Sequence, residues 1–271
     1  MGNITCKDKH YPLNGKMAST ENIAANKGLY QNTLNKHYFC KHIQRSMFTK
    51  RRLFQTDDGS FTFMLEDGQE CYHSTRGALQ EAWHIYLRAG LCYYWERYPQ
   101  SKTRPVRIFE MGFGTGLNAW VTQQKSDEQR AEVHYTALEK YPLCSEEVRS
   151  LPYSQEASFL HLHEASWECK HSLSPYFSLH KQEGDLLDYN PPPGFDLIYF
   201  DAFSPERQAD LWTCTIFARM FQALQPGGFL LTYSSKGLVK EALRSAGFSL
   251  ERLPGASGKR HMIRACKPRI Y

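Results

Sequence analysis

The sequence lacks any apolar run close to the ~18 residues that a transmembrane helix needs, so we predict no membrane span and no membrane partner. Its first residues carry charges and asparagines where a secretory signal would need an apolar stretch. We therefore expect a cytoplasmic protein. Internal repeats and low-complexity tracts are also missing.

Metal-binding patterns are absent too. The eight cysteines are scattered, without a C-x-x-C pair and without a tight cysteine and histidine cluster of zinc spacing. In a chain expected to be cytoplasmic, thiols stay reduced. We therefore predict free cysteines and no metal site.

The chain has no strong excess of charge. Its formal net charge of +5 permits a polyanionic partner such as RNA but does not require one. A hydrophobic fraction of 41% and an aromatic fraction of 14% indicate a packed core. The 271 residues are enough for one catalytic domain with an appendage.

The sequence divides into three expected parts. Residues 1–48 are rich in Asn, Lys, His and Thr without apolar periodicity, and we expect a disordered tail. Residues 49–104 are expected to form an N-terminal extension, with a β-hairpin around 61–65 and then a helix over 77–98. Ser74 and Thr75 stand where the N-cap of that helix belongs. Residues 105–271 would form the catalytic core.

Strand and helix patterns alternate through this core. Expected strands are 106–111, 133–138, 177–181, 195–200, 229–233, 248–253 and 261–266, and expected helices are 117–124, 145–151, 155–164, 209–224 and 238–246. The alternation predicts an α/β fold with a mostly parallel sheet and helices on both faces. The final helix, strand, connection and strand resemble the terminal hairpin of class I methyltransferases, in which the last strand is antiparallel.

The strongest local motif is a glycine-rich turn between the first core strand and the next helix. It reads Glu110-Met111-Gly112-Phe113-Gly114-Thr115-Gly116-Leu117-Asn118. Glycines let the backbone approach a ligand closely, and the N-terminus of the next helix offers free N–H groups. The G-x-G-x-G spacing and the acidic Glu110 before it favour S-adenosylmethionine over a dinucleotide, for which G-x-G-x-x-G is typical. A tight turn without a ligand is the alternative.

Carboxylates end three further strands. Glu139 ends the second core strand, where it can accept the hydroxyl protons of a ribose. Asp185 follows the third strand and can bind an adenine amino group, with Asp188 as the competing residue and a solvated surface pair as the alternative. Asp201 ends the most apolar strand and is expected at the reacting centre, because strand ends face the ligand crevice in open α/β sheets.

Several short motifs together resemble one family. They are Asp58-Gly59-Ser60, Tyr72-His73-Ser74, Gly77-Ala78, Glu81-Ala82, Asp201-Ala202-Phe203-Ser204-Pro205, Leu211-Trp212-Thr213, Pro226-Gly227-Gly228, Thr232-Tyr233-Ser234 and Gly258-Lys259-Arg260. Over residues 53–267 the chain resembles the methyltransferase domain of the tRNA-modifying MnmC family. The resemblance implies a class I, Rossmann-like, S-adenosylmethionine-dependent methyltransferase with a mostly parallel seven-stranded sheet.

The resemblance also implies a reaction. The family methylates the primary amine of 5-aminomethyluridine, usually 2-thiolated, at the tRNA wobble position, so the anticodon loop of tRNA is the expected partner. By matching motif, the cofactor would be surrounded by Gly112, Gly114, Gly116 and Asn118, with Glu139 on the ribose, Asp185 on the adenine and Asp201 on the target amine. The chain resembles the standalone version, without the flavin-dependent oxidase domain, so no flavin is expected.

The substrate side is less well defined. Phe203 is expected to shape the pocket, and Tyr233 to add a contact or line it. Lys259 and Arg260 would either contact tRNA phosphates or lie in a solvated loop. They are followed by His261, where the resemblance leads us to expect Glu. The family resemblance therefore supports the substrate contacts less directly than it supports the cofactor site.

Methyl transfer to nitrogen needs a neutral amine aligned with the sulfonium methyl group. Alkylamines are mostly protonated at neutral pH, so we expect Asp201 to orient the amine and help remove a proton. One rival is a spermidine-synthase-like aminopropyltransferase, for which Asp201, Glu206 and Asp210 would supply the carboxylates, or another small-amine methyltransferase. A non-catalytic tRNA-binding protein with a vestigial pocket is another. Cofactor preference would distinguish an aminopropyltransferase from the expected methyltransferase. Turnover would distinguish a non-catalytic protein from it.

Overall fold

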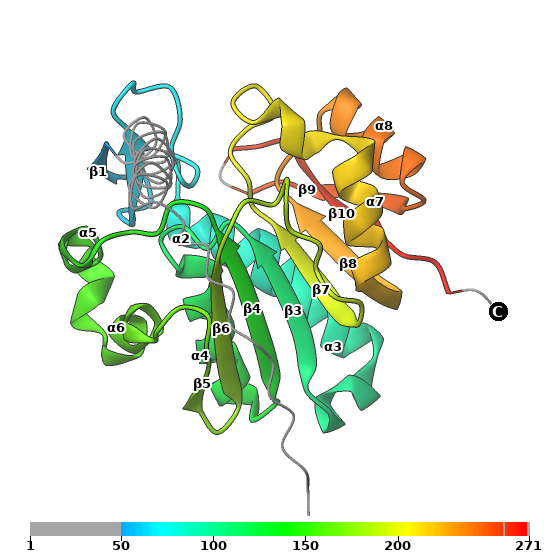
Figure 1. Ribbon diagram of the computed structural model, residues 1–271, viewed down its shortest axis with the longest axis horizontal. Coiled ribbons are helices and arrows are strands. Elements are labelled where there is room, and N and C mark those ends of the chain that lie inside the picture. Colours follow the sequence, from blue (N-terminus) through cyan, green and yellow to red (C-terminus); the bar gives the residue numbers. More distant parts are fainter. Residues whose placement is uncertain (1–49, 257, 270–271) are drawn as a thin grey trace, which may run out of the picture. The chain divides into compact units, whose positions relative to one another are not determined.

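The centre of the computed structural model is an eight-stranded sheet (Figure 1). In spatial order its strands are β5 (Lys170–Ser174), β6 (Phe177–Glu183), β4 (Val133–Glu139), β3 (Val106–Met111), β7 (Phe195–Phe200), β8 (Leu224–Thr232), β10 (His261–Cys266) and β9 (Ser249–Pro254). The structure describes residues 50–256 and 258–269, and these lie in one compact unit. The tail expected over 1–48 is outside the described residues.

Strand directions confirm the expected mostly parallel sheet. The five strands β6, β4, β3, β7 and β8 run parallel to one another. β10 pairs antiparallel with both β8 and β9, as expected for the terminal hairpin. The expected number of seven strands is wrong, because β5 adds an antiparallel edge strand beside β6. Its sequence, KHSLS, has no clear apolar alternation, so periodicity does not reveal it.

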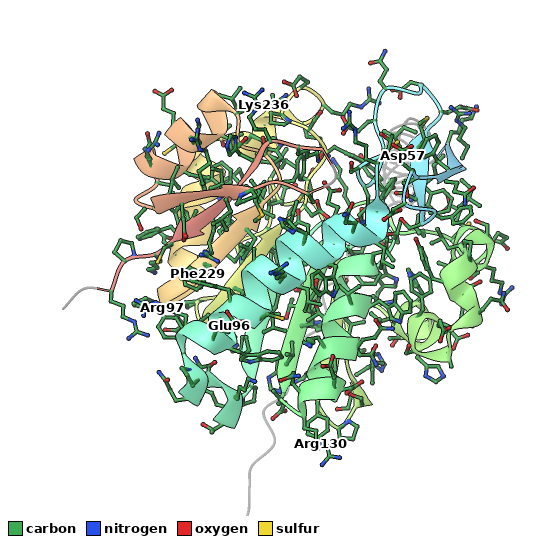
Figure 2. All side chains as sticks on the ribbon, turned by 180° about the vertical axis from the view of Figure 1, so that it is seen from behind. Asp57, Glu96, Arg97, Arg130, Phe229 and Lys236 are labelled. Carbon is green, nitrogen blue, oxygen red and sulfur yellow. The ribbon has the colours of Figure 1, made fainter. Side chains whose placement is uncertain are left out.

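Two apolar cores, one on each face, hold the sheet between helices. One face is covered by a continuous helix made of α2 (Ala78–Glu81), η1 (Ala82–Cys92) and α3 (Tyr93–Arg97), together with α4 (Leu117–Gln129) and α6 (Ala157–Glu164) (Figure 2). The other face is covered by α7 (Cys214–Ala223) and α8 (Gly237–Ser245). β7 is buried throughout because it serves both cores: Leu197 and Tyr199 face the first, and Ile198 and Phe200 the second.

Short helices make the remaining connections. They are η2 (Pro99–Thr103), α5 (Ser145–Ser150), η3 (Pro152–Gln155) and η4 (Ala209–Trp212). The helix expected over 209–224 is therefore divided into η4 and α7. Thr213 divides it, because its backbone is extended and its hydroxyl accepts a hydrogen bond from the N–H of Ile216 as the N-cap of α7.

A two-stranded hairpin of β1 (Arg51–Gln55) and β2 (Phe61–Leu65) precedes the long helix. The expected N-cap at Ser74 and Thr75 is wrong, since Gly77 occupies that position without a side-chain cap. Instead, the Ser60 hydroxyl accepts hydrogen bonds from the N–H groups of Ala78 and Leu79 at 3.0 and 3.1 Å. The turn before β2 therefore attaches the hairpin to the start of the helix.

Candidate active site

The turn from β3 to α4 brings the glycine motif against the loop that follows β7. Gly112 has a φ of +90°, and a Cβ atom there would lie 2.6 Å from the carbonyl oxygen of Asp201. Gly114 has a φ of +51°, and its N–H donates to a carboxylate oxygen of Glu139 at 2.9 Å. Both positions therefore require glycine, and the turn joins the ends of three strands.

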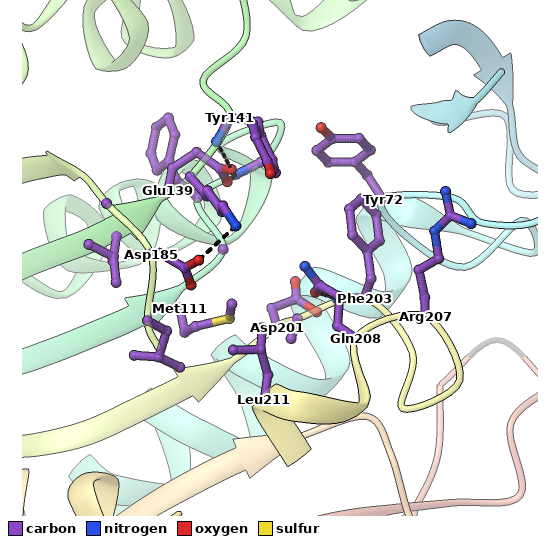
Figure 3. Close-up of a pocket in the computed structure, with 18 of the residues that line it drawn as sticks. Tyr72, Met111, Glu139, Tyr141, Asp185, Asp201, Phe203, Arg207, Gln208 and Leu211 are labelled. Atoms are coloured by element: carbon purple, nitrogen blue, oxygen red, sulfur yellow. Dashed lines mark hydrogen bonds and ion pairs between the residues drawn. The ribbon is translucent and has the colours of Figure 1, made fainter. Parts of the chain in front are cut away.

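A cavity of about 230 Å³ lies at the carboxyl ends of β3, β4, β6 and β7 (Figure 3). We call it the strand-end cavity. Its wall combines glycine backbone, apolar side chains and carboxylates, among them Gly112, Gly114, Met111, Leu138, Leu186, Glu139, Asp185 and Asp201. This is the edge at which open α/β sheets bind their ligands.

Backbone N–H groups hold two of these carboxylates. Glu139 accepts a hydrogen bond from the N–H of Tyr141 at 2.8 Å in addition to the one from Gly114. Asp185 accepts from the N–H of Leu187 at 3.0 Å and pairs with Lys140 at 2.7 Å. Asp188 is exposed and lines neither this cavity nor the second one described below. Of the two candidate aspartates, Asp185 is therefore the one at the cavity.

Asp201 lies directly after β7, with both carboxylate oxygens fixed. Tyr86 of η1 donates its hydroxyl hydrogen to Oδ1 at 2.7 Å. Asn118 of α4 donates from Nδ2 to Oδ2 at 2.8 Å. Two helices on the same face of the sheet therefore determine the orientation of this side chain.

The environment of Asp201 suits proton exchange. Its withdrawal from water raises the pKa of Asp201 to about 7, and the charge of Glu81 acts in the same direction. The hydrogen bonds from Tyr86 and Asn118 and the charge of Lys259 act in the opposite direction. A carboxylate with a pKa near 7 can accept a proton near neutral pH, as a general base must.

A second cavity, of about 280 Å³, lies between the segment that follows β2 and the loop after β7. We call it the hairpin cavity. It has aromatic walls and several charged groups, among them Tyr72, Phe203, Tyr233, Glu70, Glu81, Asp201 and Lys259. Tyr72, Asp201 and Phe203 line both cavities, so the two adjoin at the carboxylate with the raised pKa.

Lys259 is part of the hairpin cavity rather than of a solvated loop. Its ammonium group lies 2.7 Å from a carboxylate oxygen of the buried Glu81 and 4.0 Å from the centre of the Tyr233 ring. Tyr233 in turn donates its hydroxyl hydrogen to the carbonyl oxygen of Ala202 at 2.9 Å. Arg260, by contrast, is exposed and lines neither cavity.

Glu110 and Asn118 lie behind the glycine turn. The fully buried Glu110 accepts a hydrogen bond at 2.9 Å from the same Asn118 nitrogen that donates to Asp201. Burial raises the pKa of Glu110 well above its usual range. Neither residue lines the strand-end cavity or the hairpin cavity, and neither does Gly116, which packs against His163. Their contact with a cofactor stays a prediction, and the geometry makes Asn118 a link between two carboxyl groups.

Two residues of the long helix were not predicted for the site. Glu81 and Tyr86 lie on its buried side, with Ala78, Ala82 and Ile85. An acid and a tyrosine within an apolar helical stripe are the sequence signal that identifies them, because a buried carboxylate needs a partner. Here the partners are Lys259 for Glu81 and Asp201 for Tyr86.

Arg51 of β1 is a third residue of the site that was not predicted from the sequence, because it lies in no recognisable motif. Its nearly inaccessible side chain donates to the Tyr72 hydroxyl at 2.7 Å and to the carbonyl oxygen of Tyr141 at 3.3 Å. It also pairs with Glu147 at 2.9 Å. Since Tyr72 lines both cavities and Tyr141 the strand-end cavity, Arg51 connects the hairpin to the glycine side of the site.

Replacing Tyr86 with phenylalanine is expected to move the acid limb of the kcat/KM profile upward by about one to two pH units. The lost hydrogen bond stabilises ionised Asp201, so its pKa rises above about 7 and a higher pH is needed to deprotonate it. The control is Tyr199→Phe, since Tyr199 packs against Tyr86 but does not donate to Asp201. An unchanged acid limb in Tyr86→Phe would contradict this role of Tyr86.

Other sequence expectations concern cysteines, metals and membranes. The six cysteines in the described part of the chain are unpaired. Within residues 50–256 and 258–269, no group of three or more His, Cys, Asp or Glu side chains is placed to hold a metal ion. None of the helices in those ranges is both long and apolar enough to cross a membrane.

Sequence comparisons agree with this architecture. Residues 182–268 match a family model described as S-adenosyl-L-methionine-dependent methyltransferase. The tRNA 5-methylaminomethyl-2-thiouridine biosynthesis bifunctional protein MnmC of Cupriavidus metallidurans is 33% identical over 215 residues, which cover 71% of this chain and 30% of that protein. MnmC of Burkholderia mallei is 30% identical over 217 residues, 72% of this chain and 32% of that protein. The chain thus spans about a third of the length of these relatives.

Solved structures share the fold. MNMC2 from Aquifex aeolicus superimposes with a TM-score of 0.67 at 22% identity, covering 90% of this chain and 85% of that one. Spermidine synthase from Thermotoga maritima has a TM-score of 0.52 at 14% identity, with 82% and 70% covered. The expected α/β methyltransferase fold is confirmed.

Proposed function

Since the chain is related to the methyltransferase part of MnmC proteins, we propose that it is an S-adenosylmethionine-dependent N-methyltransferase that acts on tRNA. Its substrate is the primary amine of 5-aminomethyluridine, or of the 2-thio form, at the wobble position. The product is the 5-methylaminomethyl nucleoside. The observation that carries the proposal is Asp201, which lies in the walls of both cavities. The cytoplasm is the protein's proposed location.

The strand-end cavity offers the groups that S-adenosylmethionine needs. Glu139 suits the ribose hydroxyls, and Asp185 suits the adenine amino group. Met111, Leu138 and Leu186 provide apolar surface for the adenine ring. The backbone of the glycine turn allows close approach of the ligand. We therefore assign the cofactor to this cavity.

Bound S-adenosylmethionine supplies a methyl group on a sulfonium that is already a good leaving group, so the proposed transfer requires neither flavin nor metal. The protein must present a neutral amine at that methyl group. The alkylammonium form dominates at neutral pH, and Asp201 accepts one of its protons. Tyr86 and Asn118 keep the carboxylate fixed while it does so.

We assign the modified base to the hairpin cavity. Tyr72, Phe203 and Tyr233 offer aromatic surfaces on which a uridine ring can stack. Glu70 adds negative charge that favours a cationic aminomethyl group, whereas the charge of Glu81 is paired with Lys259. A wobble base in an anticodon loop is partly exposed, so its extrusion costs less than extrusion from a duplex.

Aminopropyl transfer has weaker support. This alternative requires Asp201, Glu206 and Asp210 to act together as a set of carboxylates that binds a polyamine. Asp201 and Asp210 line the strand-end cavity, whereas Glu206 is exposed and pairs with Lys236. The three groups therefore do not converge on one binding site.

A methyl-transfer assay tests the proposal. The protein is incubated with labelled S-adenosylmethionine and tRNA that carries 5-aminomethyl-2-thiouridine, and the nucleosides are analysed. We expect label in 5-methylaminomethyl-2-thiouridine, and none when the same tRNA carries unmodified uridine. A parallel reaction contains decarboxylated S-adenosylmethionine and putrescine.

The outcomes separate the functions. Transfer of the label to the aminomethyl base would support the proposal. Formation of spermidine in the parallel reaction, without tRNA methylation, would favour aminopropyl transfer. Confirmed S-adenosylhomocysteine binding without transfer to any tRNA would retain the cofactor site and rule out the tRNA substrate.

A further inference from the structure

At one edge of the sheet, α8 lies beside the β9–β10 hairpin (Figure 1). Several positively charged side chains come from these elements and from the residues next to them. Lys240 comes from α8, which packs against β9. In the β9–β10 pair, Arg252 faces Ile263 and Pro254 faces His261. Directly paired residues share a face, as do alternate residues along a strand, so Arg252 and His261 lie on the same face of the hairpin. Arg260 immediately precedes β10.

Within residues 50–256 and 258–269, these cations have no carboxylate partner. In the described part of the chain, no ion pair involves Lys240, Arg252 or Arg260, although nearby Arg264 pairs with Glu251. Partial loss of solvent, and then the charges of Arg252, Arg260 and Lys240, lower the pKa of His261. The positive charges are thus close enough to act on one another. A concentration of unpaired cations costs electrostatic free energy that a polyanion would recover.

The cluster begins where the wall of the hairpin cavity ends. Lys259 lines that cavity, and Arg260 follows it. The connecting turn is closed by the N–H of Gly255, which donates to the carbonyl oxygen of Arg260, and by the N–H of Lys259, which donates to that of Ala256. The cluster is therefore within reach of a nucleic acid that has one base in the cavity.

We propose that Lys240, Arg252, Arg260 and His261 form a docking surface for the phosphate backbone of the tRNA next to the extruded base; this inference rests on the proposed function. Phosphate contacts fix the register of a protein on a nucleic acid without reading its sequence. The surface would align the anticodon stem–loop while the cavities select the base and the cofactor. Lys259 is not part of it, because its ammonium group pairs with Glu81.

Binding of an unmodified, fluorescently labelled tRNA transcript to the full chain tests this surface without requiring methylation. Dissociation constants are measured by anisotropy over a range of salt concentrations for Arg252→Ala, Lys240→Ala and the double variant. The matched control is Lys170→Ala, an exposed cation on β5 at the opposite edge of the sheet. Thermal unfolding and S-adenosylhomocysteine binding confirm that each variant is folded.

Each single substitution is expected to weaken tRNA binding about threefold to tenfold and to lower the salt slope by about 0.9. The double variant should lose both contributions, and Lys170→Ala should match the parent protein. In the methylation assay, KM for tRNA should rise while kcat and S-adenosylhomocysteine affinity stay constant. A merely structural role would change the unfolding temperature instead.

Two failures can be told apart. If the double variant binds tRNA with the affinity and salt slope of Lys170→Ala, the docking surface is wrong whatever the enzyme methylates. If binding depends on Arg252 and Lys240 but no aminomethylated tRNA accepts a methyl group, the docking surface is supported and the proposed function is not.

Discussion

Asp201→Asn is expected to lower kcat about 10²- to 10⁴-fold, the range that general acid–base catalysis contributes. Asparagine keeps the shape of the side chain but cannot accept a proton from the alkylammonium group. Cofactor affinity should change little, because Glu139 and Asp185 lie at the ends of other strands and keep their backbone hydrogen bonds. Single-turnover methyl transfer and calorimetric titration with S-adenosylhomocysteine measure the two quantities.

The matched control is Asp188→Asn, which makes the same chemical change at an exposed carboxylate outside both cavities. It should retain the parent kcat and affinity. Normal turnover by Asp201→Asn would remove Asp201 from the mechanism. A large loss of cofactor affinity in that variant would instead make Asp201 mainly a binding residue.

Gly112→Ala is expected to weaken S-adenosylhomocysteine binding about 10- to 100-fold and to lower the free energy of unfolding by about 1–3 kcal/mol. The added Cβ would lie 2.6 Å from the Asp201 carbonyl oxygen, and the φ of +90° is one that L-residues rarely adopt. Either the turn or the loop after β7 must move, and both belong to the cavity wall. Calorimetric titration and denaturant unfolding measure the effects.

Gly237 provides the control for this substitution. It is the first residue of α8, has no neighbour within 4 Å of an added Cβ, and does not have a positive φ. Gly237→Ala should therefore leave cofactor binding unchanged and keep or slightly raise stability. Gly112→Ala with parent affinity would show that the turn is not part of the cofactor site.

Local patterns predict most of the core. The apolar run 195–200 identifies β7, and the glycine motif identifies the turn after β3, because each is specified by residues adjacent in sequence. β5 escapes prediction because Lys170–Ser174 has no regular apolar pattern and forms only by pairing with β6. An edge strand of this kind depends on a neighbour rather than on its own sequence.

The residues of the site also differ in whether local sequence patterns predict them. Glu139, Asp185 and Asp201 are predictable because each ends a recognisable strand, and all three line the strand-end cavity. Tyr86 is 115 positions from Asp201, and Lys259 is 178 positions from Glu81, so their pairing arises only when the fold is complete. Composition and periodicity contain no information about contacts over such separations.

The two cavities draw on different parts of the chain. Ten of the fifteen residues that line the hairpin cavity precede residue 105, whereas nineteen of the twenty-one that line the strand-end cavity follow it. Tyr72 and His73 also line the strand-end cavity, but the other eight of these ten residues do not. Substitutions at those eight positions can therefore reshape the hairpin cavity without changing the lining of the strand-end cavity. For protein engineering, the extension is therefore the part of the chain at which one cavity can be redesigned independently of the other.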